Sequence, residues 1–460
     1  MWMKTTKCSS HRFPVLLSLC ALCLFGICGA VRAQESNPMQ LTLAQAIDLA
    51  LKQNRSLGLA RLSVVESEHK KEIAHSAYFP QIANQSSVLH VTEFAGVEIP
   101  VGAFANLPLT GPIPAHTLFI DQGALTSYTS GTGLTQPLTQ MFKIRASNRA
   151  ATTDINTAKI QVNQAENEVT LKVRQIYYEL LIAQLKQEAA DEEVRASQIK
   201  DQEAQDAVKH GRALDVAALE GRAGLLDARQ AALTQNLQIH SLSLTLNDLL
   251  GLPLHTQLHL DSNPSEASVS IPSREESIRI AEEQSPGVRS AQQAVLKAQA
   301  GLSVAKDAYI PDVTGLARYS YQSGVPLLVH NFGTFGFTLS YDLFDGGRRN
   351  AEVKDSRTVL TQAELNLTKV KEEVAVQVEA AYDKVEQLQN MVGVAEDALN
   401  VRIELARLSD RQFEQNAALA SARGEAQAKV ASAKASYLEA TLGLSLAQAD
   451  LKRTIGQLPR

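Results

Sequence analysis

The chain has 460 residues, 45% of them hydrophobic, with 44 Lys and Arg against 49 Asp and Glu. A hydrophobic share of this size is typical of a folded protein and excludes both a disordered chain and a bundle of membrane helices. The excess of acidic side chains argues against a nucleic acid or a negatively charged membrane surface as the partner.

The first 33 residues carry the pattern of a secretory signal peptide. A basic start is formed by Lys4, Lys7 and Arg12. An apolar run from Val15 to Ile27 follows, and Ala33 ends a cleavage site of small residues. We therefore expect this segment to be removed and the rest of the chain to be exported.

All four cysteines lie inside this segment: Cys8, Cys20, Cys23 and Cys28. The mature chain then has no disulfide and must be held together by burial or by partners. A lipid-anchored cysteine is the alternative here, but bulky residues precede three of the cysteines where a small one is usual. No later stretch approaches 18 consecutive apolar residues, so any passage through a membrane must use strands and not helices.

Two helix-start signals lie 231 residues apart. Each is a capping box, in which a hydroxyl and a longer polar side chain satisfy free N–H groups. The matching positions are Thr42 with Gln45 and Ser273 with Glu276. Each signal predicts a helix that runs to a proline, Pro80 in the first half and Pro311 in the second.

After each proline the pattern changes to alternation of apolar and polar residues, which predicts strands. The candidates are at about 82–93 and 127–138, and at about 312–322 and 335–343. Each is close to the ~9–11 residues that a tilted strand needs to cross a bilayer. The residues expected to face lipid are Tyr319, Tyr321, Phe335, Phe337, Leu339 and Tyr341. Alternation alone also allows the alternative, a hairpin packed on a soluble core.

A long helix is predicted to follow each pair of strands, over about 140–209 and 348–414. From Val374 to Leu399, small and apolar residues recur at alternating spacings of four and three, which is the heptad seam of a coiled coil. Subtracting 205 from each number gives a matching seam from Val169 to Val194. The chain therefore contains its long helix twice.

Each long helix is predicted to end in a short turn, which we call the tip. The tips are at 210–214 and 415–419, where Gly211 and Asn416 suit the left-handed backbone that closes a helix. A return helix is expected after each tip, and the one in the first half begins at Asp215. Each half therefore ends in a helical hairpin.

The chain thus consists of two tandem helix–strand–strand–helix–helix repeats, 34–251 and 272–460, joined by a linker at 252–271. Four strands from one chain cannot close a barrel, and open edges would leave backbone groups unpaired in lipid. Two copies would give eight strands with a filled interior, whereas three give 12 strands and a lumen. The expected fold is mostly α with a membrane β part, a trimeric 12-stranded β-barrel continued by a long α-helical coiled-coil tunnel.

Three motifs resemble the TolC family of outer-membrane efflux channels, and their order covers nearly the whole mature chain. They are Leu-Thr-Leu-Ala-Gln-Ala-Ile at 41–47, Gly-x-x-Leu-Asp-Val at 211–216 and Tyr-Asp-Leu-Phe-Asp-Gly-Gly at 341–347. The resemblance implies a homotrimeric channel in outer-membrane lipid, with a large periplasmic portion and no cofactor. It also implies that the tips dock a periplasmic adaptor (membrane fusion) protein and an inner-membrane transporter. The channel would then be a passive exit duct for efflux or type I secretion.

In this family, acidic residues near the tips constrict the periplasmic aperture. The resemblance implies that role for Asp206, Asp215, Asp410 and Glu414. This chain departs from the family pattern in two ways. Ala420 occupies the position in the second half that matches Asp215, so the second half lacks this acid. The first tip is also about two residues shorter than is usual in the family. A solvated helix face is the alternative for these acids. The residues expected to dock the adaptor are Gly211, Arg212, Ala213, Leu214, Asn416, Ala417, Ala418 and Leu419.

Two other classes of protein are alternatives for this sequence. An enzyme is not expected: His255 and His259 lie in the proline-bounded linker, and no HExxH, GxSxG or phosphate-loop pattern has a supporting context. A periplasmic coiled-coil adaptor or structural protein without a channel is the alternative function. An adaptor would have one helical hairpin between halves of β domains, and a structural coiled coil would not need paired amphipathic strands.

Overall fold

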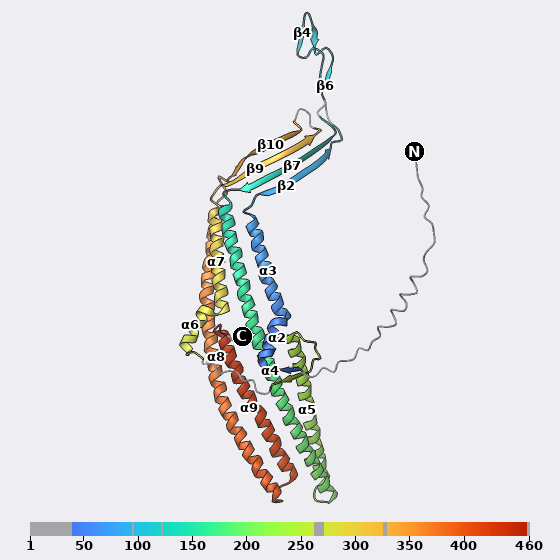
Figure 1. Cartoon of the computed structure of the whole chain (residues 1–460), viewed down its shortest axis with the longest axis vertical. Helices are drawn as coiled ribbons and strands as arrows, with labels where there is room; N and C mark the ends of the chain where they lie inside the picture. Colours follow the sequence, from blue (N-terminus) through green and yellow to red (C-terminus); the bar gives the residue numbers. More distant parts are fainter. Residues whose placement is uncertain (1–38, 94–95, 121–122, 262–270, 325–328, 458–460) are drawn as a thin grey trace, which may run out of the picture.

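The computed structural model describes residues 39–93, 96–120, 123–261, 271–324 and 329–457, so the expected signal peptide lies outside the described residues. Figure 1 shows an elongated molecule, with a four-stranded sheet toward one end and long helices running away from it. The same order of elements (two short helices, strand, strand, long helix, return helix) occurs up to Leu250 and again from Arg274.

Each half begins with two short helices where the sequence analysis predicts one. They are α2 Leu43–Gln53 and α3 Arg55–Ser76, then α6 Arg274–Gln284 and α7 Pro286–Asp307. The first pair is separated by Asn54, whose backbone is extended and whose side chain accepts the N–H groups of Ser56 and Leu57. In the second pair Pro286 occupies the start of α7. The prediction was wrong because these caps lie within a continuous helical sequence pattern.

The four long strands form one antiparallel sheet with the order β10-β9-β7-β2. They are β2 Gln81–His90, β7 Thr126–Pro137, β9 Asp312–Ser323 and β10 Asn331–Ser340. Strand β10 begins four residues before the predicted 335–343 and ends three residues earlier. Its first residues pair with β9, Asn331 opposite Tyr321 and Gly333 opposite Tyr319, although their composition resembles a turn.

The segment between β2 and β7 rises beyond the sheet as two short ribbons in succession (Figure 1). Strands β3 Val97–Ile99 and β6 Leu118–Ile120 pair in the first ribbon. Strands β4 Ala105–Leu107 and β5 Gly111–Ile113 pair in the second. The sequence pattern between 93 and 127 does not indicate these four strands, because strands of three residues are too short to show alternation.

Two helical hairpins form the other end of the molecule (Figure 1). They are α4 Met141–Lys209 with α5 Asp215–Leu250, and α8 Arg348–Glu414 with α9 Ala420–Thr454. Helix α4 has 69 residues, which at 1.5 Å per residue makes it about 100 Å long. It also packs against α9 of the other hairpin. None of the described helices combines the length and the apolar character needed to cross a membrane.

The heptad seams of α4 and α8 contribute to two hydrophobic cores, which lie near the middle of each helix. Val173, Ile176 and Leu180 of α4 are buried in one cluster, and Val378 and Val385 of α8 are buried in the other. Farther toward the tip the α8 seam is less covered, since its positions from Val392 onward are half-buried. Burial of a seam in this way is the main stabilising contribution to a long helix.

The segment 252–271, predicted as the linker between the repeats, contains a short strand. Strand β8 Leu258–Leu260 pairs in parallel with β1 Met39–Leu41, which precedes the first helix. The hydroxyl of Tyr177 lies 3.0 Å from the Leu41 carbonyl and 3.1 Å from the Asp261 carbonyl, and burial raises its pKa to about 12. Tyr177 therefore ties both strands to helix α4.

Candidate functional site

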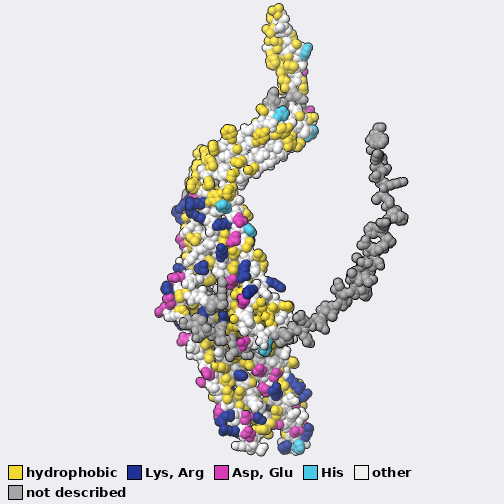
Figure 2. All heavy atoms as spheres, viewed as in Figure 1, with side chains coloured by type: hydrophobic (Ala, Val, Ile, Leu, Met, Phe, Trp, Pro, Cys, Tyr) yellow, Lys and Arg dark blue, Asp and Glu magenta, His cyan; other side chains and the backbone are white. Residues whose placement is uncertain are grey.

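One face of the sheet carries a cluster of large apolar side chains that the described part of the chain leaves exposed. The pairing of β9 with β10 places Phe335, Phe337 and Leu339 opposite Ala317, Gly315 and Val313. The same register puts Tyr319 and Tyr321 on this face. Phe335, Phe337 and Leu339 are 90%, 78% and 67% exposed. Figure 2 shows hydrophobic side chains gathered over the sheet, whereas charged ones lie mainly over the helices.

The same face continues onto β7 and β2, where Ile82, Val88 and Tyr128 were not expected on an apolar face. Ile82 pairs with Leu134, and Val88 pairs with Tyr128. Between these apolar pairs lie hydroxyl and amide groups that bond to one another. Asn84 Nδ2 donates to Thr132 Oγ1 at 2.9 Å, and the hydroxyls of Ser86 and Ser130 lie 2.8 Å apart. These polar residues interrupt the alternation of apolar and polar side chains, so the sequence does not mark Ile82, Val88 and Tyr128 as members of the apolar face.

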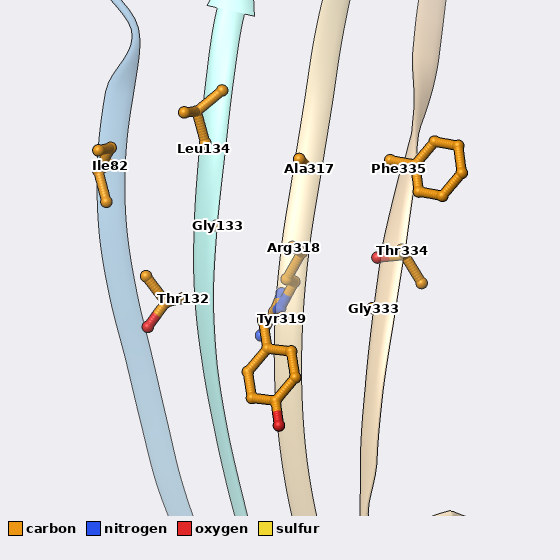
Figure 3. A pocket seen from close by; sticks show the side chains of 10 residues that line it. All are labelled: Ile82, Thr132, Gly133, Leu134, Ala317, Arg318, Tyr319, Gly333, Thr334 and Phe335. Carbon is orange, nitrogen blue, oxygen red and sulfur yellow. The ribbon is translucent and has the colours of Figure 1, made fainter.

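A groove of about 490 Å³ crosses the sheet between Ile82, Leu134, Tyr319 and Phe335 (Figure 3). It lies where the small residues of neighbouring strands leave a gap between these larger side chains. Among the described residues that line it, Arg318 and Tyr319 are the titratable ones, and alternation puts them on opposite faces of β9. The groove therefore suits apolar contact and lacks a paired acid and base.

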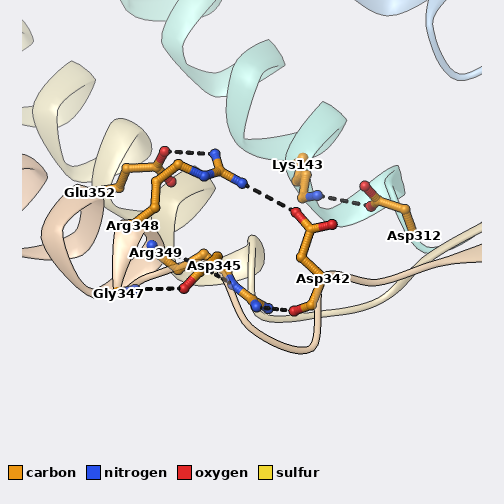
Figure 4. A network of polar contacts seen from close by, with 8 residues as sticks. All are labelled: Lys143, Asp312, Asp342, Asp345, Gly347, Arg348, Arg349 and Glu352. Carbon is orange, nitrogen blue, oxygen red and sulfur yellow. Dashed lines mark hydrogen bonds and ion pairs between the residues drawn. The ribbon is translucent and has the colours of Figure 1, made fainter.

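The end of β10 is joined to α8 by a polar junction centred on Asp345 (Figure 4). Asp345 Oδ1 accepts the N–H of Gly347 at 3.0 Å. Asp345 Oδ2 accepts from Arg349 Nε at 2.6 Å and from the Arg349 backbone N–H at 3.1 Å. The hydrogen bond to the Arg349 side chain lowers the pKa of Asp345 to about 2. Gly346 and Gly347 both have φ in the left-handed region, +65° and +87°, which explains the paired glycines.

Tyr341 belongs to this junction and lies one residue beyond β10. The other five residues expected to face lipid lie within β9 and β10. The guanidinium carbon of Arg349 lies 4.6 Å from the centre of the Tyr341 ring and 5.5 Å from that of Tyr309. Arg349 also donates through Nη2 to the Asp342 carbonyl. On the neighbouring helix Lys143 pairs with Asp312 at 2.8 Å (Figure 4). Charged groups therefore gather where the apolar sheet meets the helices.

The two tips have the same backbone geometry. Gly211 has φ +66° and Asn416 has φ +55°. In the first tip the N–H of Arg212 donates to the Ala207 carbonyl, and in the second the N–H of Ala417 donates to the Gln412 carbonyl, both at 2.8 Å. The residues that precede the return helices, Leu214 and Leu419, are 80% and 65% exposed.

The four acids expected at the aperture divide between the tips, two at each. Asp206 pairs with Lys209 of its own helix at 3.3 Å. Asp410 pairs with Arg423 of the return helix at 2.7 Å, and that guanidinium stands 5.3 Å from the Phe413 ring. Asp215 opens α5, where a carboxylate faces the positive end of the helix dipole, and Glu414 closes α8.

Contacts between the hairpins near the tips were missed by the sequence analysis. Lys200 of α4 pairs with Glu425 of α9 at 2.7 Å. Glu203 accepts the backbone N–H of Ser421 at 3.2 Å. Within the first hairpin, Asp201 of α4 is buried against Gly221 of α5, and its Oδ1 has no hydrogen-bond partner among the described residues. No local signal could have found these pairs, because the partners on α9 are more than 200 residues away.

Solved structures of outer-membrane channels share this fold. The CmeC outer membrane channel of Campylobacter jejuni is 15% identical to this chain, with a TM-score of 0.70 over 90% of this chain and 85% of the CmeC chain. The open state of the MtrE outer membrane channel of Neisseria gonorrhoeae is 18% identical to this chain, with a TM-score of 0.67 over 91% of this chain and 90% of the MtrE chain. The fold is therefore that of a channel protein of the outer membrane.

The sequence comparisons identify the family within this class. The profile of the outer membrane efflux protein family matches residues 46–252 and 277–457, so the chain belongs to this family. The outer membrane efflux protein BepC of Brucella suis biovar 1 (strain 1330) is 25% identical over an alignment of 374 residues that covers 78% of this chain and 73% of BepC.

Family membership confirms the resemblance on which the functional prediction was based. The chain is an outer-membrane channel of multipartite efflux systems and has a large periplasmic portion. The alternative of a periplasmic adaptor or a structural coiled coil is thereby set aside. The family and its structural neighbours are transport channels and not enzymes.

Proposed function

We propose that three copies of the chain close a 12-stranded β-barrel that continues into a long periplasmic α-helical tunnel. The observation that carries this proposal is the open sheet, whose two edges are β2 and β10. All neighbouring strands in the sheet are antiparallel, so β2 and β10 run in opposite directions. The β10 edge of one copy can therefore pair with the β2 edge of the next in the same antiparallel pattern.

In this assembly the apolar face of the sheet, with Phe335 and Phe337, contacts outer-membrane lipid. The opposite face carries mainly hydroxyl and amide side chains and lines the lumen. Closure is needed because unpaired N–H and C=O groups at a strand edge are costly in hydrocarbon. Three copies are favoured over two because a barrel of eight strands is filled by its own side chains.

The helical hairpins form the wall of the tunnel, and their two tandem repeats supply similar surfaces around it. The half-buried part of the α8 seam, from Val392 onward, packs against a neighbouring copy. The tips at Gly211–Leu214 and Asn416–Leu419 dock a periplasmic adaptor, which is supported by their matched geometry and by the exposed Leu214 and Leu419. An inner-membrane transporter then drives substrates through the duct, which is itself passive.

The aperture of the tunnel is narrowed by acids at the tips. Asp206 and Asp215 are the candidates on the first hairpin, and Asp410 and Glu414 on the second. Threefold symmetry would bring like charges together, which favours cations near the axis. Of the four, Asp410 is the most strongly held, since Arg423 pairs with it.

The test of this proposal is the oligomeric mass and the conductance of the mature protein. We expect a trimer in mild detergent by light scattering, and discrete conductance steps in a planar bilayer. A monomer that needs no detergent and does not conduct would contradict both the barrel and the duct.

A further inference from the structure

Arg318 is an isolated charge in the middle of the sheet. The four long strands contain only two residues of the types Asp, Glu, Lys and Arg, namely Asp312 and Arg318. Asp312 opens β9 and is paired with Lys143 at the junction. Arg318 lies six residues farther along β9 and has no ion pair within the described part of the chain.

The side chain of Arg318 lies on the face opposite the large apolar residues. The register places Arg318 opposite Thr334 of β10 and Gly133 of β7, whereas Tyr319 is opposite Gly333 and Thr132. Residues on the Arg318 face of β9 are Thr314, Leu316, Ser320 and Gln322. An arginine in mid-strand is costly on a lipid face but tolerated in an aqueous lumen.

Gly131 and Gly133 of the neighbouring strand β7 leave room for the side chain of Arg318. A Cβ atom at Gly131 would lie 2.4 Å from Arg318 Nε and 2.5 Å from Nη2, and the same construction at Gly133 meets Arg318 Cγ at 3.9 Å. The Arg318 side chain therefore lies along β7 where these glycines leave room, and it is still exposed. A side chain held against the sheet in this way keeps its charge at a defined height.

We propose that the three Arg318 guanidinium groups of the trimer form a cationic belt in the lumen that binds anionic solutes carrying phosphate, sulfate or carboxylate groups. This inference rests on the proposed trimeric barrel. A guanidinium presents its N–H groups as a fork that matches the oxygens of such groups, which a lysine ammonium does not. The belt gives the duct a second charged zone, opposite in sign to the acids of the tips.

The first experiment locates the side chain. Residues 34–460 contain no cysteine, so Arg318→Cys and Tyr319→Cys each give a single thiol. A negatively charged, membrane-impermeant methanethiosulfonate reagent should modify Arg318→Cys in the bilayer-inserted trimer and leave Tyr319→Cys unmodified. Equal modification of both, or modification of Tyr319→Cys alone, would overturn the luminal position of Arg318.

The second experiment measures binding, with inorganic tripolyphosphate added on the barrel side of single channels. We expect block of the wild-type current, with at least about tenfold weaker block in Arg318→Gln because a charge-assisted hydrogen bond is lost. Ser320→Ala, on the same face, is the matched control, and tripolyphosphate should block this variant as strongly as the wild type. Unchanged block in Arg318→Gln, with a conducting trimer, would overturn the belt and leave the proposed channel intact.

Two further outcomes are distinguishable. If Arg318→Gln does not assemble, Arg318→Lys keeps the charge, and we expect it to conduct with weakened tripolyphosphate block. Wild-type block by the lysine variant would then contradict the role of the guanidinium fork. A wild-type protein that neither trimerises nor conducts would overturn the proposed function, and the belt with it.

Discussion

Arg349 Nε lies 2.6 Å from Asp345 Oδ2 at the point where strand β10 gives way to helix α8. The two side chains are 10% and 12% exposed, so both partners of this ion pair are largely shielded from solvent. The Arg349 guanidinium also stacks over the ring of Tyr341. One contact therefore joins the end of the sheet to the start of the longest helix of the second half.

The first prediction concerns the pH dependence of this junction. The folded-state pKa of Asp345 is lowered to about 2 from an ordinary 3.8, so the carboxylate stabilises the fold above about pH 4 and the contribution is lost as pH falls through about 2. We expect Asp345→Asn to lower the thermal unfolding midpoint at neutral pH, and to approach wild type near pH 2. Asp342→Asn, which removes a more exposed contact to Arg348 at 3.6 Å, is the control. An equal loss at both pH values would show that the charge of Asp345 is not what stabilises the junction.

A second prediction separates the two faces of the sheet. Phe337→Arg places a charge on the proposed lipid face and should cost up to ~2–4 kcal/mol, less if the site lies near the interface. Thr338→Arg, one residue along and on the other face, should cost clearly less. The measurement is the free energy of unfolding from the bilayer in denaturant. Similar costs for the two variants would contradict the assignment of the faces.

A third prediction tests the backbone of the first tip. Gly211→Ala forces a Cβ into the left-handed region, and we expect a loss of ~1–2 kcal/mol in the free energy of unfolding. Gly224→Ala is the matched control, because Gly224 lies inside α5 with open space around its position. That substitution should stabilise the helix by ~0.5–1 kcal/mol. A neutral Gly211→Ala would mean that the tip has an alternative backbone.

A fourth prediction tests Asp410 as an aperture acid. Arg423→Ala removes its ion partner, and since the pair is partly exposed the stability should change by no more than ~1 kcal/mol. The freed carboxylate should make the channel more selective for cations, which a reversal potential in a salt gradient would measure. Arg407→Ala is the control, because Arg407 pairs with Glu404 of its own helix. A reversal potential that does not move would remove Asp410 from the aperture.

A fifth prediction concerns the first tip. Replacing Asp206 and Asp215 by Asn together should raise the single-channel conductance, because fewer like charges would then hold cations near the axis. Glu98→Gln, in the ribbon beyond the sheet, is a control far from the tips. Conductance equal to that of wild type would leave both acids as solvated helix residues.

Much of the fold could be predicted from local sequence signals. The long helices end at Lys209 and Glu414, next to the Gly and Asn that were expected to close them. Heptad spacing identified the buried seam, since period and burial are coupled along a single helix. The face shared by Phe335 and Phe337 also followed from alternation alone. The two breaks at Asn54 and Pro286 were missed because a cap inside a periodic stretch changes the pattern very little.

The partners of these elements were decided by the tertiary structure. Sequence alternation identified β7 and β9 separately, but their pairing, with Tyr128 opposite Ser323, joins residues 195 positions apart in the chain. The same holds for Lys200 with Glu425 and for the short strands β1 and β8. Local patterns record which face of a helix or strand is apolar, because that depends on neighbouring residues. Which surface covers that face depends on how distant segments pack, and so the position of Arg318 above Gly131 appeared only in the folded chain.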